Sequence, residues 1–117
     1  MCIRDRFPHI RLIVPHGAGV IPLLAERVEL FRSVASRPSE LGVKDLLRRF
    51  YYDIAGTPST LQTTALNSIA EPTQVLYGSD YPWTSAELVA RLLTDLDAVA
   101  GKDWRGTTTR NAGRLFG

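Results

Sequence analysis

The sequence predicts an α/β fold in which a parallel sheet is built from repeated strand-helix units. Three short apolar runs, each closed by turn residues, alternate with longer segments whose apolar residues recur at helical spacing. This alternation is typical of βαβ units, whose strands run parallel. The composition is that of a globular protein, with 44% hydrophobic residues, 22% charged residues and a net charge of +2. We expect neither nucleic-acid binding nor membrane insertion, because the charge is small and every apolar stretch is short.

The first predicted unit is a strand over residues 12–14 followed by a helix. Pro15 ends the strand, and the flexible His-Gly-Ala-Gly segment over residues 16–19 leads into the helix. The apolar face of this helix is formed by residues at helical spacing, namely Ile21, Leu24, Val28 and Phe31. A further helix is expected to open at Pro38 and to carry apolar residues on one face.

The second and third units follow the same order. A strand over residues 51–54 precedes a helix that starts after Pro58, and a strand over residues 74–77 stops at a Gly-Ser step. Residues 84–87 read as a capping box with Thr84 as the cap, so the next helix should begin there. The tail is weakly patterned, because Gly106 and three threonines oppose a helix before Asn111.

Two titratable residues stand at predicted strand ends. His16 follows the first strand and Asp80 follows the third, and the C-terminal ends of parallel strands are where catalytic groups collect. Two simpler interpretations stay open. Asp80 can be a helix cap, with Thr84 as a rival, and His16 can be a turn histidine bonded to backbone. The glycines in residues 17–19 also suit a backbone cradle for an anion.

Four segments carry a family resemblance. They are residues 7–19, 50–55, 76–82 and 111–117, which include Pro-His-Gly-Ala-Gly and Gly-Ser-Asp-Tyr-Pro. In this order they resemble the last third of the amidohydrolase-related family, which includes aminocarboxymuconate-semialdehyde decarboxylase, hydroxybenzoate-type decarboxylases and metal-dependent hydrolases. The resemblance implies the C-terminal part, about strands six to eight, of a TIM (β/α)8 barrel of the metal-dependent hydrolase type. A whole barrel takes about 250 residues, so residues 7–117 are interpreted as the C-terminal portion of one domain and residues 1–6 as a non-native leader.

The resemblance also implies roles for the two strand-end residues. Asp80 corresponds to a metal ligand or general base, and His16 to a residue beside the metal that polarises or protonates the substrate. The implied cofactor is a divalent metal, with Zn²⁺ first. The family holds its metal mainly through a His-X-His pair and another His that this sequence lacks. The other histidine, His9, is read as a surface residue, because seven extended residues span roughly 23 Å. We therefore expect an incomplete metal site in this chain.

Substrate contacts are predicted at the same end of the strands. Arg37 lies near the place where decarboxylase-like members carry an arginine that grips a carboxylate, although a solvated loop arginine is the simpler interpretation. Tyr81, Trp83 and Tyr52 are candidates for an aromatic-substrate pocket, but Tyr52 can equally face the helices. Asp53 is interpreted as a structural hydrogen-bond acceptor. The predicted function is hydrolysis or decarboxylation of a small carboxylated or aromatic substrate.

Two other functions are alternatives to this one. A serine esterase would match the His-Gly-Ala-Gly segment, but the required Gly-X-Ser-X-Gly pattern does not occur. A stand-alone, non-catalytic interaction module is the non-enzymatic alternative. For the parent enzyme we expect a small-molecule substrate, a homodimer and, from the single Cys2, a reducing, cytoplasmic location. Expressed alone, the chain should be inactive and poorly stable, because a three-stranded sheet has two open edges.

Overall fold

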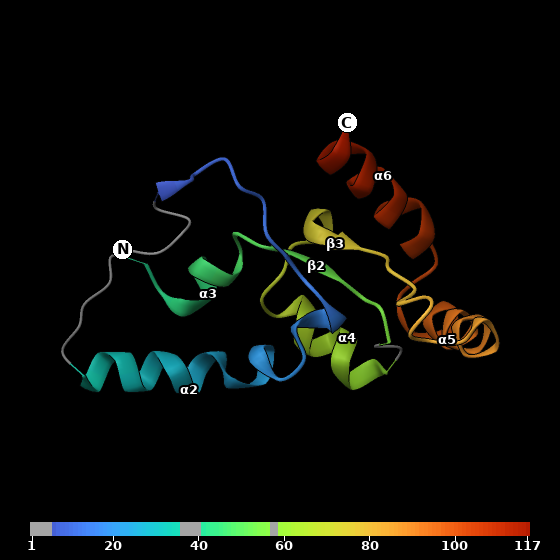
Figure 1. Ribbon diagram of the computed structural model, residues 1–117. Helices are drawn as coiled ribbons and strands as arrows, with labels where there is room; N and C mark the ends of the chain where they lie inside the picture. Colours follow the sequence, from blue (N-terminus) through green and yellow to red (C-terminus); the bar gives the residue numbers. More distant parts are fainter. Residues whose placement is uncertain (1–5, 36–40, 57–58) are drawn as a thin grey trace.

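A three-stranded parallel sheet is the centre of the computed structural model, which describes residues 6–35, 41–56 and 59–117. The strands are β1 (Ile13–Val14), β2 (Tyr51–Asp53) and β3 (Val75–Leu76), in the spatial order β1-β2-β3 (Figure 1). Val14 of β1 lies opposite Tyr52, and Tyr52 lies opposite Val75 of β3. The predicted parallel sheet is confirmed, although each strand is shorter than its apolar run.

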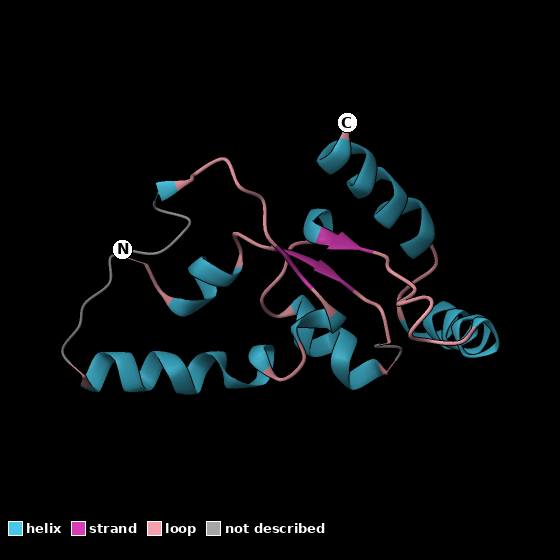
Figure 2. Ribbon diagram, viewed as in Figure 1, coloured by secondary structure: helices cyan, strands magenta, loops and turns pink. Residues whose placement is uncertain are grey.

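Helical segments fill the connections between the strands and most of the chain after β3 (Figure 2). They are η1 (His16–Ala18), α2 (Ile21–Val34), α3 (Val43–Leu47), α4 (Thr60–Asn67), η2 (Pro72–Gln74), α5 (Ala86–Val99) and α6 (Trp104–Phe116). Because helical crossovers join the strands, the strands point the same way and their C-terminal ends share one edge. The helix expected to open at Pro38 begins at Val43 within the described residues, since Pro38 itself lies outside them.

The start of α5 differs from the predicted capping box. Ser85 is the N-cap, and its hydroxyl accepts a hydrogen bond from the backbone N–H of Leu88 at 3.3 Å. Thr84 is not the cap, because its hydroxyl donates instead to the Oδ2 atom of Asp80 at 3.0 Å. The helix therefore begins one residue later than the sequence pattern suggested.

The C-terminal helix α6 is the largest departure from the sequence prediction. It runs unbroken through Gly106 and the three threonines, which were expected to oppose it. Tertiary contacts overcome the weak local propensity. The buried side-chain amide of Asn111 donates to the carbonyls of Pro72 at 2.7 Å and Val75 at 2.8 Å, and Trp104 is buried at the start of the helix. These bonds fasten α6 to the beginning of β3.

The core lies where β2 meets the surrounding helices. Its buried residues are Ala18, Ala25, Tyr52, Ile54, Leu66, Ile69, Ala70, Leu96 and Trp104. The Tyr52 side chain is fully buried, and its hydroxyl donates to the carbonyl of Leu47 at 2.7 Å. Burial raises the pKa of Tyr52 to about 12. Tyr52 is therefore a core residue, and its suggested place in a substrate pocket is wrong.

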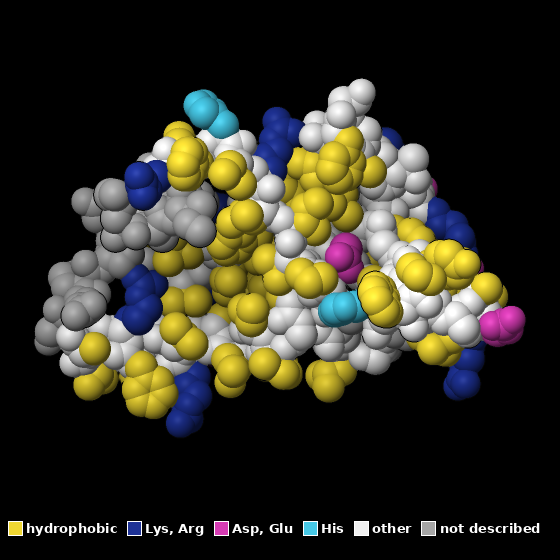
Figure 3. Space-filling view, in the orientation of Figure 1, with side chains coloured by type: hydrophobic (Ala, Val, Ile, Leu, Met, Phe, Trp, Pro, Cys, Tyr) yellow, Lys and Arg dark blue, Asp and Glu magenta, His cyan; other side chains and the backbone are white. Residues whose placement is uncertain are grey.

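One part of the surface stays apolar because the sheet is open. Ile13 in β1 is 39% exposed. Figure 3 shows hydrophobic side chains gathered over the middle of the face that is turned towards the viewer. In a closed barrel such strand residues are packed by neighbouring strands. β1 and β3 are both edge strands here, so the described residues form an open α/β unit rather than a closed barrel. None of the helices in the described ranges is long and apolar enough to cross a membrane.

Candidate active site at the C-terminal edge of the sheet

The candidate site is formed by two loops, η1 after β1 and residues 78–84 after β3. Three residues in these loops, His16, Ala18 and Asp80, have positive φ angles of 54°, 64° and 61°. They are the only non-glycine residues with positive φ among those the structure describes. This left-handed conformation costs an L-residue roughly 1–3 kcal/mol and is enriched at functional sites. Backbone strain is thus concentrated at the two strand ends that the sequence singles out.

His16 is held by the neighbouring strand end. Its backbone N–H donates to Oδ1 of Asp53 at 3.1 Å, and its ring Nδ1 lies 3.0 Å from the carbonyl oxygen of Ala55. A carbonyl oxygen can only accept, so this contact is a hydrogen bond when Nδ1 carries the proton. The ring is otherwise exposed, and its Nε2 has no hydrogen-bond partner among the described residues. The ring therefore presents Nε2 to whatever binds at this edge.

Asp53 links the three strand ends. Besides the N–H of His16, its Oδ1 accepts the N–H of Ala55 at 3.0 Å. A Cβ atom placed on Gly78 would lie 3.6 Å from the carboxyl carbon of Asp53, so the chain leaving β3 passes close by. The interpretation of Asp53 as a hydrogen-bond acceptor is confirmed, and its partners lie on two different loops.

Asp80 is held within its own turn. Its Oδ2 accepts the hydroxyl of Thr84 at 3.0 Å, and its carbonyl accepts the backbone N–H of the same residue at 2.8 Å. Because Ser85 caps α5, the interpretation of Asp80 as the helix cap is wrong. The carboxylate is half-buried and lies at the same edge of the sheet as His16, since both follow parallel strands.

Two of the three backbone N–H groups of the anion cradle predicted over residues 17–19 are bonded within the turn. The N–H of Ala18 donates to the carbonyl of Pro15 at 3.0 Å, and the N–H of Gly19 donates to the carbonyl of His16 at 3.0 Å. Both N–H groups are therefore used within η1. The glycines instead allow a tight turn, which the side chain of Gln62 supports by donating to the Gly19 carbonyl at 3.0 Å.

The predicted substrate residues are placed only in part. Arg37 lies outside the described residues. Trp83 follows Asp80 by three residues and is 89% exposed, so the described residues cover little of its surface. His9, read as a surface residue, is exposed in the structure.

The described residues do not make up a metal site by themselves. No group of three or more His, Cys, Asp or Glu side chains among them could hold an ion. A catalytic zinc takes three protein ligands and keeps one position open. Asp80 offers a suitable hard oxygen donor, but a complete set of three ligands would need at least one group from outside the described residues.

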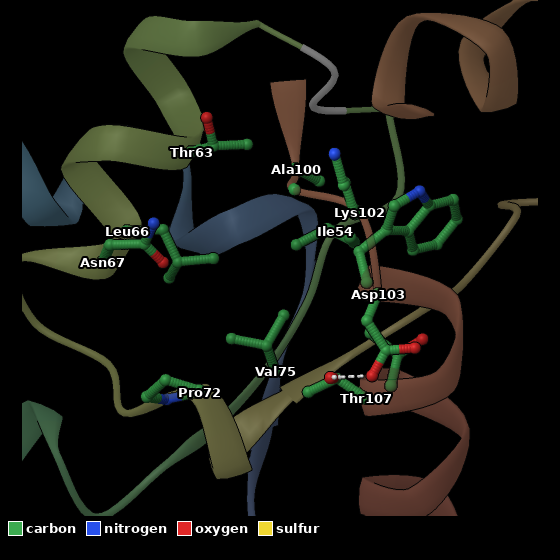
Figure 4. A pocket seen from close by; sticks show the side chains of 13 residues that line it. Ile54, Thr63, Leu66, Asn67, Pro72, Val75, Ala100, Lys102, Asp103 and Thr107 are labelled. Carbon is green, nitrogen blue, oxygen red and sulfur yellow. Dashed lines mark hydrogen bonds between the residues drawn. The ribbon is translucent and has the colours of Figure 1, made fainter. Parts of the chain in front are cut away.

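A separate cavity lies between α4, β3 and the start of α6 (Figure 4). Its volume is about 310 Å³, and its lining combines the apolar side chains of Ile54, Leu66 and Val75 with the polar side chain of Asp103, which accepts from Thr107 at 3.4 Å. Neither His16 nor Asp80 lines it. This cavity and the strand-end residues are therefore different places in the molecule.

Comparison with known proteins places the chain among decarboxylases and amidohydrolases. Models of known protein families give no match. The chain is 30% identical over 99 residues to a 6-methylsalicylic acid decarboxylase from Penicillium expansum, a match that covers 82% of this chain and 31% of the relative. The crystal structure of an amidohydrolase II superposes with a TM-score of 0.75 at 28% identity and covers 96% of this chain and 37% of that one.

A further solved structure carries a metal. It is the 5-carboxyvanillate decarboxylase of Novosphingobium aromaticivorans, complexed with manganese and 4-hydroxy-3-methoxy-5-nitrobenzoic acid. The TM-score is 0.77 at 18% identity, and the match covers 97% of this chain and 35% of that one. The chain thus spans about a third of the length of the relatives it matches. Sequence and fold together show that the chain belongs to the amidohydrolase-related family and has the fold of part of its TIM barrel.

Proposed function

We propose that the chain is part of a metal-dependent decarboxylase that acts on a small aromatic carboxylate. The observation that carries this proposal is the 30% identity to a 6-methylsalicylic acid decarboxylase over most of the chain. Decarboxylation is preferred over hydrolysis because a second relative, from Penicillium terrestre, is also a decarboxylase and is 32% identical over 87 residues. In this proposal β1, β2 and β3 are strands six, seven and eight of the barrel.

His16 is proposed to handle the proton. In a decarboxylation the bond between the ring carbon and the carboxylate breaks, CO₂ leaves, and a proton must reach the same carbon. The exposed Nε2 of His16 suits this task, because Nδ1 already bonds the carbonyl of Ala55. When the protonated ring gives up its Nε2 proton, the neutral ring keeps its Nδ1 proton and that bond.

Asp80 is proposed as one ligand of a divalent metal. Its carboxylate is half-buried at the same edge of the sheet, and the hydroxyl of Thr84 donates a hydrogen bond to it. Zn²⁺ is the first candidate, and Mn²⁺ is the alternative that the manganese-bound neighbour favours. A bound divalent ion would supply Lewis-acid binding for oxygens of the substrate.

The remaining parts of the proposal concern the substrate and the setting of the enzyme. Arg37 is proposed to pair with the substrate carboxylate, and Trp83 to cover its aromatic ring, since a guanidinium and an indole suit these groups. The parent enzyme is proposed to be a cytoplasmic homodimer.

The test uses the enzyme expressed from the complete coding sequence that contains this chain. Hydroxybenzoates, with 6-methylsalicylate first, are supplied with Zn²⁺ or Mn²⁺, and loss of substrate and release of CO₂ are followed. His16→Ala should lower kcat by roughly 10²–10⁴-fold, the range for a general acid. Asp80→Ala should lower both the bound metal and the turnover. The matched control, His9→Ala, should leave both unchanged.

Two results would contradict the proposal. One is turnover that stays undiminished when a chelator has removed the metal. The other is an enzyme that binds the metal and folds normally yet decarboxylates none of the carboxylates tested. Wild-type turnover in the His16→Ala variant would remove only the role of His16.

A further inference from the structure

We propose that Asp53 is a positioning residue for His16. Through one carboxylate oxygen it fixes both the backbone of His16 and the backbone group that binds the His16 ring. The ring is thereby held as the Nδ1–H tautomer and presents Nε2 to the substrate. This inference rests on the proposed function only in giving His16 the role of proton carrier; the arrangement itself can be tested without any turnover.

The first step is the attachment of the backbone. Oδ1 of Asp53 accepts the N–H of His16 at 3.1 Å and the N–H of Ala55 at 3.0 Å. Hydrogen bonds to a carboxylate are stronger than bonds between neutral groups. His16 also has a positive φ angle, so its backbone needs a partner that offsets the strain. Asp53 supplies that partner from the end of the adjacent strand.

The second step is the attachment of the ring. The carbonyl of Ala55 lies 3.0 Å from Nδ1 of His16, and the N–H of the same Ala55 is already bound by Asp53. Ala55, whose carbonyl accepts the hydrogen bond from the His16 ring, is thus held by Asp53. The same carboxylate also holds the backbone of His16. Asp53, Ala55 and His16 form a closed loop of three hydrogen bonds, which we call the Asp53 clasp.

The third step is the backbone conformation beside the clasp. Gly56 follows Ala55 with a φ angle of 62°, and a Cβ atom there would lie 3.6 Å from Nδ1 of His16. Gly78 likewise lies against the carboxyl group of Asp53. Glycines therefore stand where the chain turns beside the clasp, and the ring is left with one free nitrogen, Nε2.

The experiment measures the tautomer of the His16 ring by ¹⁵N NMR on this chain. The sequence has two histidines, so a His9→Gln variant leaves only the signal of His16. At about pH 8.5, where a histidine ring is neutral, His16 should show a protonated Nδ1 and an unprotonated Nε2. His9 in the His16→Gln variant should show the mixture of tautomers of an exposed imidazole.

Substitutions at Asp53 then test the cause. Asp53→Ala should return the His16 ring to a mixture of tautomers, whereas Asp53→Asn keeps an acceptor oxygen and should preserve the Nδ1–H form. In Asp53→Asn the backbone amides of His16 and Ala55 should exchange with solvent about tenfold faster, because a neutral acceptor is weaker than a carboxylate. Asp95→Ala, an exposed aspartate on α5, is the matched control and should change neither signal.

The outcomes separate this inference from the proposed function. If wild-type His16 shows mixed tautomers, whether because the clasp does not form or because the chain does not keep this fold, the inference is wrong. It is equally wrong if Asp53→Ala folds and keeps the Nδ1–H ring. Should Asp53→Ala unfold, the Asp53→Asn exchange rates decide, and unchanged rates overturn the inference. A clasp found intact in an enzyme without decarboxylase activity would remove the proposed function alone.

Discussion

The two strand ends of the candidate site hold their titratable residues in opposite ways. His16, after β1, depends on Asp53 and Ala55, which lie 37 and 39 residues further along the chain. Asp80, after β3, depends on Thr84, four residues away in the same turn. The position of His16 is therefore a product of the assembled sheet, whereas the orientation of Asp80 is set by local structure.

This difference predicts which hydrogen bonds of the site remain when the sheet is disrupted. Loss of the pairing between β1 and β2 separates His16 from both of its partners. The same loss leaves the turn over residues 80–84 with its hydrogen bonds. The following variants probe this contrast, beginning with the one expected to have the largest effect.

Replacing Tyr52 by alanine should have the largest effect. The ring is fully buried and its hydroxyl bonds the Leu47 carbonyl, so Tyr52→Ala should lower the free energy of unfolding by about 3–5 kcal/mol. Urea unfolding followed by circular dichroism measures this loss. In the same variant the His16 ring should lose its hydrogen bond to Ala55 and show a mixture of tautomers. If the ring keeps its Nδ1–H form, His16 is not held from across the sheet.

The control at the same position is Tyr52→Phe, which keeps the ring and removes the hydroxyl. It should cost only about 1 kcal/mol. Because burial raises the pKa of Tyr52 to about 12, the unfolded chain loses this proton before the folded chain does. Stability from Tyr52 is therefore full below pH 10, the ordinary value, and falls as pH rises towards 12. Tyr52→Phe should lack this contribution to the alkaline loss.

Removing the amide of Asn111 should have an intermediate effect and should spare both strand ends. Its side chain is 2% exposed and bonds the carbonyls of Pro72 and Val75. Asn111→Ala removes the amide that donates to both carbonyls. It should lower the free energy of unfolding, measured in urea, by about 2 kcal/mol. Because these bonds lie at the start of β3, away from the site, the His16 tautomer should not change. Asn67→Ala, at an exposed position, should stay within about 0.5 kcal/mol of the wild type.

The smallest effect is expected at Thr84. Thr84→Val removes the hydroxyl that bonds Asp80 and should cost about 1 kcal/mol, while Thr84→Ser should keep most of the stability. The His16 ring signal should stay the same in both. A change of the His16 tautomer in Thr84→Val would show that the two strand ends are coupled, and the contrast drawn above would fail.

Local patterns in the sequence predicted much of the fold. Apolar runs and turn residues identified the three strands, and the strand ends placed His16 and Asp80 at one edge. The length of α6 could not be predicted, because Asn111 stabilises that helix through carbonyls 36 and 39 residues away. The hydrogen bond between the Ala55 carbonyl and the His16 ring could not be predicted either. Every residue has a backbone carbonyl, so the sequence does not indicate which one the ring will bond. The capping serine was missed for a related reason, as Thr84 is bound by Asp80 instead.

The fastening of α6 has a consequence for how such a protein can diverge. Asn111 bonds the chain at the N-terminal end of β3, while His16, Asp80 and Trp83 follow the C-terminal ends of their strands. The residues that hold the last helix are therefore different from those proposed to contact the metal and the substrate. We expect substitutions over residues 81–83 to leave the hydrogen bonds of Asn111, and with them the attachment of the last helix, unchanged.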